Sequence, residues 1–121
     1  MNEIKNSKRY DLEERTFLFA KRARGLVKML RKTIGNIEDG KQLIRSSGSV
    51  GANYIEANEA LSKKDFNMRI KICRKEAKES QFWLRLLDVA DDKNMSDEQD
   101  DLLVEATELM KIFGSIMRKS V

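Results

Sequence analysis

Proline and histidine are both absent from this 121-residue chain, and cysteine occurs once, at Cys73. Because proline is missing and Leu, Ala, Glu, Lys and Arg are abundant, we expect an all-helical fold. A single cysteine excludes a disulfide within the chain and argues against a thiolate metal cluster. Without histidine there is no imidazole for general base catalysis, metal ligation or a catalytic triad. We therefore expect a protein that is not an enzyme and that carries no metal or other cofactor.

Long apolar runs are missing as well. No stretch approaches the roughly 20 apolar residues that a membrane-spanning helix needs, and the first residues do not follow the pattern of a secretory signal. We expect a cytoplasmic protein with no membrane partner. The length predicts a single domain over residues 10–121. Residues 1–9 have little apolar periodicity, so we expect them to be frayed or disordered.

Apolar residues recur at alternating steps of three and four, the spacing of amphipathic helices. One such stripe, from Leu12 to Ile34, predicts a first helix over about 12–33. Gly35 and Asn36 are expected to end it in a left-handed turn. A second stripe, from Gly40 to Leu61, predicts a helix over about 37–61.

Two further helices are predicted in the second half of the chain. Ser62 opens a capping box ahead of an apolar stripe that extends from Phe66 to Leu87. Residues 91–94 have the composition of a linker, and Ser96, with Gln99 three residues on, is expected to cap the fourth helix. Four helices with short connections predict an up-and-down antiparallel four-helix bundle.

The segment RSSGSVGANYIEAN, residues 45–58, is rich in small side chains. Its GSVG could be a loop that cradles phosphate, as in KH domains, but no strand is predicted beside it and no G-K-[ST] sequence follows it. The helical spacing of Leu43, Val50 and Tyr54 continues through it, which favours the middle of a helix. The small residues then form a thin face on which another helix can pack closely; they are the pairs Ser47 with Gly51 and Gly48 with Ala52.

The first predicted helix has a face of a single charge sign. No acidic residue occurs between Arg15 and Glu38, and residues 1–87 carry 20 Lys and Arg against 11 Asp and Glu, whereas 88–121 carry 4 against 9. Such a face either keeps the protein soluble or contacts the phosphates of a nucleic acid. The candidate nucleic-acid-binding residues are Lys21, Arg24, Lys28, Arg31 and Lys32.

Polar residues just after the thin face have two interpretations. Glu56, with Glu76 and Glu79, could form a carboxylate site for a metal or an acid–base reaction, but di-iron bundles also need histidine. We favour a structural role in which Asn53 or Glu56 bonds to Arg74 or Lys75, or caps a neighbouring helix.

The third predicted helix is apolar over a wide part of its circumference. Phe82, Trp83 and Leu86 extend its apolar side beyond the stripe that one bundle core requires. Such residues either complete the core or form an interface with a second subunit. Cys73 lies on the inner stripe, so we expect it to be a small buried hydrophobe.

The combination RSSGSVGANYIEAN, SKKDF and KEAKESQFWLRLL resembles the bacterial four-helix bundle proteins also called 23S ribosomal RNA intervening-sequence proteins. The resemblance covers roughly residues 10–118 and departs from the usual pattern at Gly48. It implies an up-and-down bundle that assembles into a ring-like homopentamer. It also implies kinship with retroelement accessory proteins that bind nucleic acid and a reverse transcriptase. No catalytic residues carry over.

Two functions follow as expectations. The first is a non-enzymatic oligomeric bundle that binds RNA or DNA electrostatically through the basic face, and a reverse transcriptase is a candidate protein partner. The alternative is a protein-interaction scaffold with no nucleic acid partner, in which the basic face meets an acidic protein or maintains solubility.

Overall fold

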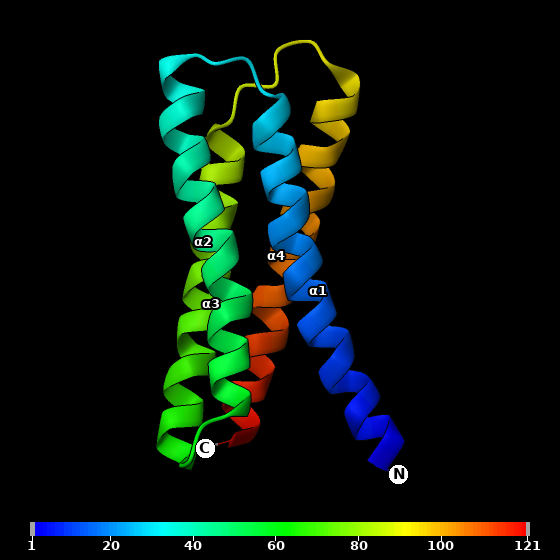
Figure 1. Ribbon diagram of the computed structural model, residues 1–121, viewed down its shortest axis with the longest axis vertical. Coiled ribbons are helices and arrows are strands. Elements are labelled where there is room, and N and C mark those ends of the chain that lie inside the picture. Colours follow the sequence, from blue (N-terminus) through cyan, green and yellow to red (C-terminus); the bar gives the residue numbers. More distant parts are fainter. Residues whose placement is uncertain (1, 121) are drawn as a thin grey trace.

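Four helices make up the fold. The computed structural model describes the backbone of residues 2–120 and the side chains of residues 12–119. The helices are α1 (Asn2–Met29), α2 (Ile34–Asn58), α3 (Lys63–Leu86) and α4 (Lys93–Ser120), and they run alternately up and down (Figure 1). The predicted all-α, up-and-down four-helix bundle is confirmed, and the described backbone contains no strand. The side chains of residues 1–9 lie outside the described range, and the expectation that this segment is frayed or disordered stays a prediction.

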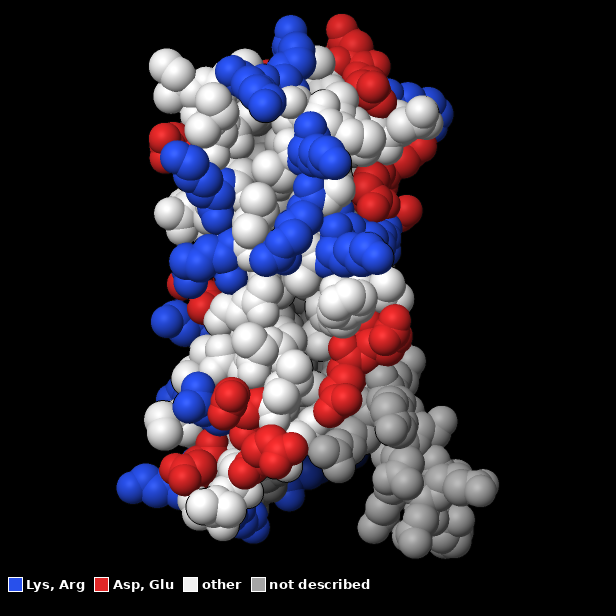
Figure 2. Space-filling view, in the orientation of Figure 1, with Lys and Arg blue, Asp and Glu red and all other residues white. Residues whose placement is uncertain are grey.

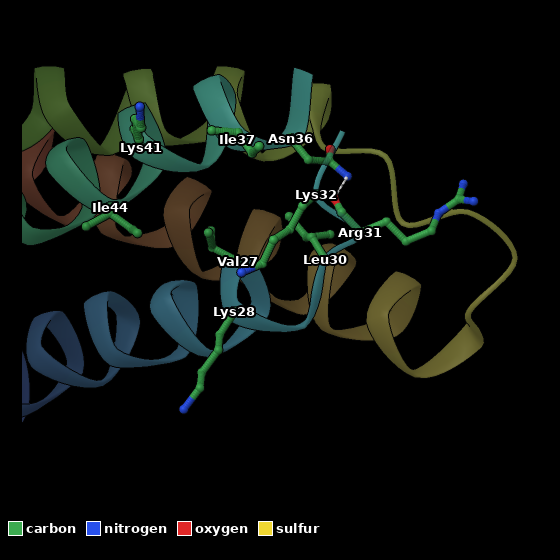
Figure 3. Close-up of a pocket in the computed structure, with 9 residues that line it drawn as sticks. All are labelled: Val27, Lys28, Leu30, Arg31, Lys32, Asn36, Ile37, Lys41 and Ile44. Atoms are coloured by element: carbon green, nitrogen blue, oxygen red, sulfur yellow. Dashed lines mark hydrogen bonds between the residues drawn. The ribbon is translucent and has the colours of Figure 1, made fainter. Parts of the chain in front are cut away.

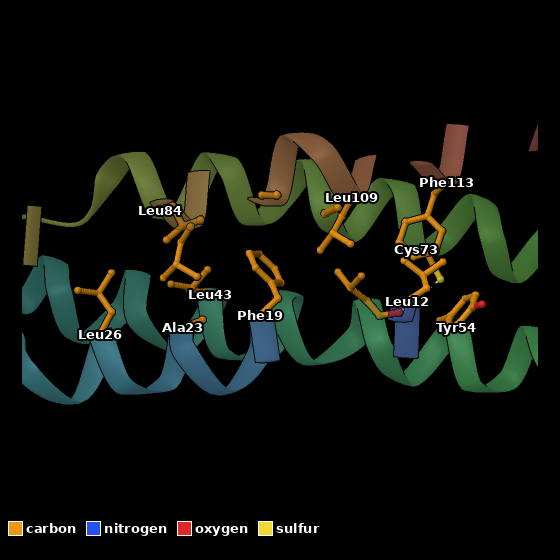
Figure 4. Packing of buried hydrophobic residues seen from close by; sticks show 14 of the residues in the cluster. Leu12, Phe19, Ala23, Leu26, Leu43, Tyr54, Cys73, Leu84, Leu109 and Phe113 are labelled. Atoms are coloured by element: carbon orange, nitrogen blue, oxygen red, sulfur yellow. Dashed lines mark hydrogen bonds between the residues drawn. The ribbon is translucent and has the colours of Figure 1, made fainter. Parts of the chain in front are cut away.

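The core follows the predicted apolar stripes along the bundle (Figure 4). Near the α2–α3 turn, the centroids of the Tyr54 and Phe113 rings lie 5.8 Å apart. Burying a large apolar side chain contributes about 1.5–3 kcal/mol, so this core is the main source of stability. Two stripe residues lie outside it: Ile34 is 85% exposed and Leu61 is 100% exposed. Ile34 begins a new helix and Leu61 follows the end of one, so neither continues its stripe. The largest fully buried apolar residues are Phe19, Leu26, Leu43, Ile70, Leu84, Leu102, Leu109 and Phe113.

The turn between α1 and α2 differs from the prediction. Helix α1 ends at Met29, and Gly35 and Asn36 form the first turn of α2 rather than a left-handed end of α1. The reason is Thr33, whose hydroxyl oxygen accepts a hydrogen bond from the Asn36 backbone N–H at 3.1 Å and so caps α2. The Asn36 side chain is buried against the α3–α4 linker instead of marking a break.

The start of α4 also differs from the prediction. The helix begins at Lys93, and Asp92 caps it by accepting a hydrogen bond from the Met95 backbone N–H at 2.9 Å. Gln99 does not join a capping box with Ser96. Its side-chain amide donates to the backbone carbonyls of Leu84 and Leu87, at 2.7 and 3.1 Å, and so satisfies the C-terminal end of α3. The linker therefore covers 87–92 rather than 91–94.

Small residues bring α1 and α2 close together. The segment 45–58 lies within α2, as the periodicity predicted. A Cβ added at Gly51 would lie 3.1 Å from the Thr16 hydroxyl oxygen and 3.6 Å from the Thr16 backbone carbon. Ser47 is fully buried on the same side. This pair gives the close helix approach expected of it.

The second small pair behaves differently. Gly48 lies beneath the guanidinium of Arg24, at 3.3 Å from an added Cβ, and Ala52 is exposed. Ala52 is exposed because it lies outside the arc of α2 that faces α1, so this pair makes no close helix contact within the chain. Ser46 turns the other way, and its hydroxyl lies 2.9 Å from that of Ser80 on α3.

Candidate nucleic-acid interface

The five candidate cations lie on α1 and on the turn that follows it. Lys21, Arg24 and Lys28 belong to α1, whereas Arg31 and Lys32 lie in the α1–α2 turn rather than on the helix. All five are exposed. Figure 2 shows Lys and Arg side chains gathered on the half of this face nearest the α1–α2 turn. We call the surface formed by Lys21, Arg24, Lys28, Arg31 and Lys32 the basic surface.

The other two arginines among the described residues of α1 face α4. The guanidinium of Arg15 donates to Glu105 at 2.7 and 3.0 Å and to Glu108 at 3.3 Å. That of Arg22 donates to Glu98 at 3.0 and 2.5 Å, and this hydrogen bonding raises the pKa of Arg22. Two-pronged arginine–carboxylate pairs orient the helices they join. The acidic N-terminal half of α4 thus neutralises one side of α1 and leaves the other side basic.

The basic surface is not neutralised by the side chains that the structure describes. In the part of the chain whose side chains are described, none of its five cations forms an ion pair. The Lys21 ammonium lies 5.9 Å from the centre of the Phe17 ring, and Arg24 donates to the backbone carbonyl of Ala20 at 3.3 Å. Neither contact cancels a charge, so all five remain available to an anionic partner.

A hollow of about 430 Å³ opens between α1 and α2 at the turn (Figure 3). Its floor is apolar and consists of Val27, Leu30, Ile37 and Ile44. Its remaining lining residues are Asn36 and four cations, namely Lys28, Arg31, Lys32 and Lys41. Figure 3 shows Lys28, Arg31 and Lys41 pointing away from the floor. Three of these cations also belong to the basic surface, so the hollow is continuous with it.

Sequence reasoning missed Lys41 and the apolar floor. Lys41 closely follows the acidic residues Glu38 and Asp39, so the sequence around it does not have a single charge sign. Its ammonium lies 3.9 Å from Glu38, and both side chains are 68% exposed. Only the packing of α2 on α1 makes Lys41 and Lys28 line the same hollow. Ile37 was one signal for the apolar floor, because it is an apolar residue outside the inner stripe of α2 and close to the basic turn.

The predicted interface residues of α3 divide into two kinds. Trp83 is half-buried and packs against the core, with its ring 5.0 Å from that of Phe82 in an edge-on arrangement. Phe82 and Leu86 are 55% and 49% exposed, and Met68 on the same helix is 53% exposed. The wide apolar side of α3 is therefore only partly used by the core of one chain.

The polar residues after the thin face are not brought together into a reactive site. The side-chain oxygen of Asn53 accepts a hydrogen bond from Arg69 on α3 at 3.0 Å, so the contact across to α3 exists with a different partner from Arg74 or Lys75. Glu56 is exposed on α2. Glu76 is buried and lies 3.2 Å from Arg45, which also contacts Glu79 at 3.1 Å.

Among the described residues, no group of three or more His, Cys, Asp and Glu side chains is placed to hold a metal ion. None of the helices, as far as the structure describes them, has an apolar stretch long enough to cross a membrane.

The described residues thus define the protein as an all-α four-helix bundle with a basic surface at the α1–α2 turn. The sequence model of the 23S rRNA-intervening sequence protein family matches residues 8–115, so the chain belongs to that family. A crystal structure of a protein of unknown function from the S23 ribosomal protein family of Bacteroides thetaiotaomicron is similar, with a TM-score of 0.78 and 31% identity. The match covers 92% of this chain and 98% of that one. No curated protein matches the chain.

Proposed function

We propose that this protein is a non-enzymatic, self-assembling helical bundle that binds RNA or DNA through its basic surface. The observation that carries the proposal is the division of charge on α1. Arg15 and Arg22 are paired with carboxylates of α4, whereas the five cations of the basic surface are exposed and form no ion pair with any side chain that the structure describes. A surface of uncompensated cations attracts a polyanion by releasing the counterions condensed on its phosphates.

Electrostatic binding has a specific signature. Affinity should fall steeply with salt, and it should depend little on base sequence because phosphates carry no sequence information. The test is the triple charge reversal of Lys21, Arg24 and Lys28 to Glu, measured by fluorescence anisotropy with a labelled oligonucleotide. Losing three phosphate contacts should reduce the slope of log K against log salt by about 2–3.

A matched control keeps the change in net charge the same. Lys64, Lys111 and Lys119 are exposed and lie away from the basic surface, so their triple reversal to Glu should weaken binding far less. Circular dichroism should show both variants folded. Equal binding by the unmodified protein and the Lys21, Arg24 and Lys28 variant would refute the proposal.

Assembly is the second part of the proposal. Phe82, Leu86 and Met68 leave apolar area of α3 exposed, and association would bury it. Family membership supports a ring-like homopentamer, in which the basic surface would be repeated around the ring. The molecular mass from light scattering should be a multiple of the 14.0 kDa of one chain, and Phe82→Glu should lower that mass. A mass of one chain at micromolar concentration would contradict assembly.

A protein partner such as a reverse transcriptase would add to this function without replacing it. If the protein retained no nucleic acid at physiological salt but recovered an acidic protein in a pull-down, the basic surface would instead belong to a protein scaffold. Sensitivity of that recovery to the same triple reversal would show that the surface itself is used.

A further inference from the structure

We infer that the nucleic acid is bound as a single strand and that an unpaired base enters the hollow between α1 and α2. This inference rests on the proposed function and adds to it the kind of nucleic acid that fits. Its starting point is the mixed character of the hollow, whose floor is apolar and whose charged lining residues, among those the structure describes, are all cations.

The apolar floor does not favour the binding of a phosphate. Ile37 is 42% exposed on the floor, and Met29 and Ile34, at 57% and 85% exposed, lie at the ends of the helices that meet in the turn. Placing phosphates over these side chains would cover apolar surface with a charged group, which brings no hydrophobic gain. The face of a base, in contrast, is apolar and gains by leaving water. Lys28 and Arg31 point away from the floor (Figure 3), so phosphates bound to them would lie beside the hollow and not over it. A base of the same strand can then lie over Val27, Ile37 and Ile44.

A duplex does not fit this arrangement. In a duplex the bases are stacked and paired, so a bound protein meets the backbone and the edges of the bases but not their apolar faces. Filling the hollow from a duplex would require extruding a base, which costs the pairing and stacking of that base. A single strand already has unstacked bases that can enter, and about 430 Å³ is enough room for at least one.

The hollow should not select one base strongly. Its one lining side-chain amide, Asn36, is already engaged: its nitrogen donates to the backbone carbonyls of Arg31 and Asp88, and its oxygen accepts from the Asp88 N–H. An occupied amide cannot read the edge of a base. Apolar contact with the base and ionic contact with phosphate both tolerate any sequence.

The experiment compares three labelled probes at one salt concentration: a 20-nucleotide single strand, its duplex, and a strand of the same length with several abasic sites. The unmodified single strand should bind about five- to tenfold more tightly than the other two, as expected when a base face leaves water. Ile37→Ser should remove most of this preference and leave duplex binding unchanged.

Ile55→Ser is the matched control, because Ile55 is another exposed isoleucine on α2, 56% exposed against 42% for Ile37, and does not line the hollow. It should leave the preference intact. Equal affinity for single strand and duplex, a preference for duplex, or a preference that survives Ile37→Ser would overturn the inference. Loss of binding in the charge-reversal variant would still uphold the proposed function in each of these cases. No binding of any probe at physiological salt would refute both.

Discussion

The side-chain amide of Asn36 and the backbone of Asp88 hydrogen-bond to each other in both directions. The Asn36 nitrogen donates to the Asp88 carbonyl oxygen at 2.9 Å, and the Asn36 oxygen accepts from the Asp88 N–H at 2.9 Å. The same nitrogen donates to the Arg31 carbonyl at 3.0 Å. One buried side chain, 4% exposed, thus joins the α1–α2 turn to the α3–α4 linker at one end of the bundle.

Asn36→Ala should lower the free energy of unfolding by about 2–3 kcal/mol, because three backbone groups lose their partner in a buried place. Urea unfolding followed by circular dichroism measures this. Asn94→Ala, at an exposed position in the first turn of α4, is the control and should change little. Similar effects of the two substitutions would show that the Asn36 bonds do not stabilise the fold.

The start of α4 provides a second prediction. Asp92→Ala removes the oxygen that caps the Met95 N–H, so it should destabilise the protein by about 1 kcal/mol. Ser96 lies inside the helix, so Ser96→Ala should change the free energy of unfolding very little. The reverse ranking in urea unfolding would mean that the helix begins at Ser96.

Two glycines should respond oppositely to alanine. A Cβ at Gly25 meets no atom within 4 Å, so Gly25→Ala should stabilise the exposed helix α1 by about 0.5–1 kcal/mol. Gly51→Ala gains the same helix propensity but crowds Thr16 at 3.1 Å, so we expect a net loss of about 1 kcal/mol. Thermal and urea unfolding measure both. A gain in stability for Gly51→Ala would show that α1 can move away without cost.

Cys73 should be a slow thiol. Burial raises its pKa from 9.0 to about 12, and its sulfur donates to the Val50 carbonyl at 3.4 Å. Iodoacetamide at pH 8 should therefore label the folded protein much more slowly than the protein in urea. Equal rates of labelling would show that the thiol is accessible in the folded state.

The same shift predicts a pH dependence of stability. The unfolded chain loses the thiol proton near pH 9 while the folded chain keeps it to about 12. The contribution of the protonated thiol to the free energy of unfolding is thus complete below pH 9 and is lost as pH rises toward 12. The difference in unfolding free energy between the unmodified protein and Cys73→Ala should narrow from pH 8 to 10.5. A constant difference would contradict the raised pKa.

Much of the fold could be predicted because the stripes are local. Residues three and four apart share a helix face whatever surrounds them, so Phe19, Leu43 and Leu109 could be placed in the core from spacing alone. The helix ends could not, because Asn36 and Gln99 looked like local turn and capping residues. Their real partners lie far along the chain, at Asp88 and at Leu84.

The candidate site divides in the same way. The exposed cations Lys21, Arg24 and Lys28 follow from one helix of a single charge sign. The hollow does not, since Lys41 and Ile44 line it together with Val27 only when α2 packs on α1.

The sequence by itself determined the four helices, the faces they bury and the sign of charge on α1, since periodicity and charge are properties of neighbouring residues. The tertiary structure alone decided which arginines of α1 are neutralised and which residues fasten the ends of the bundle. It also decided where an apolar floor lies among cations, since each of these depends on contacts between residues distant in the chain.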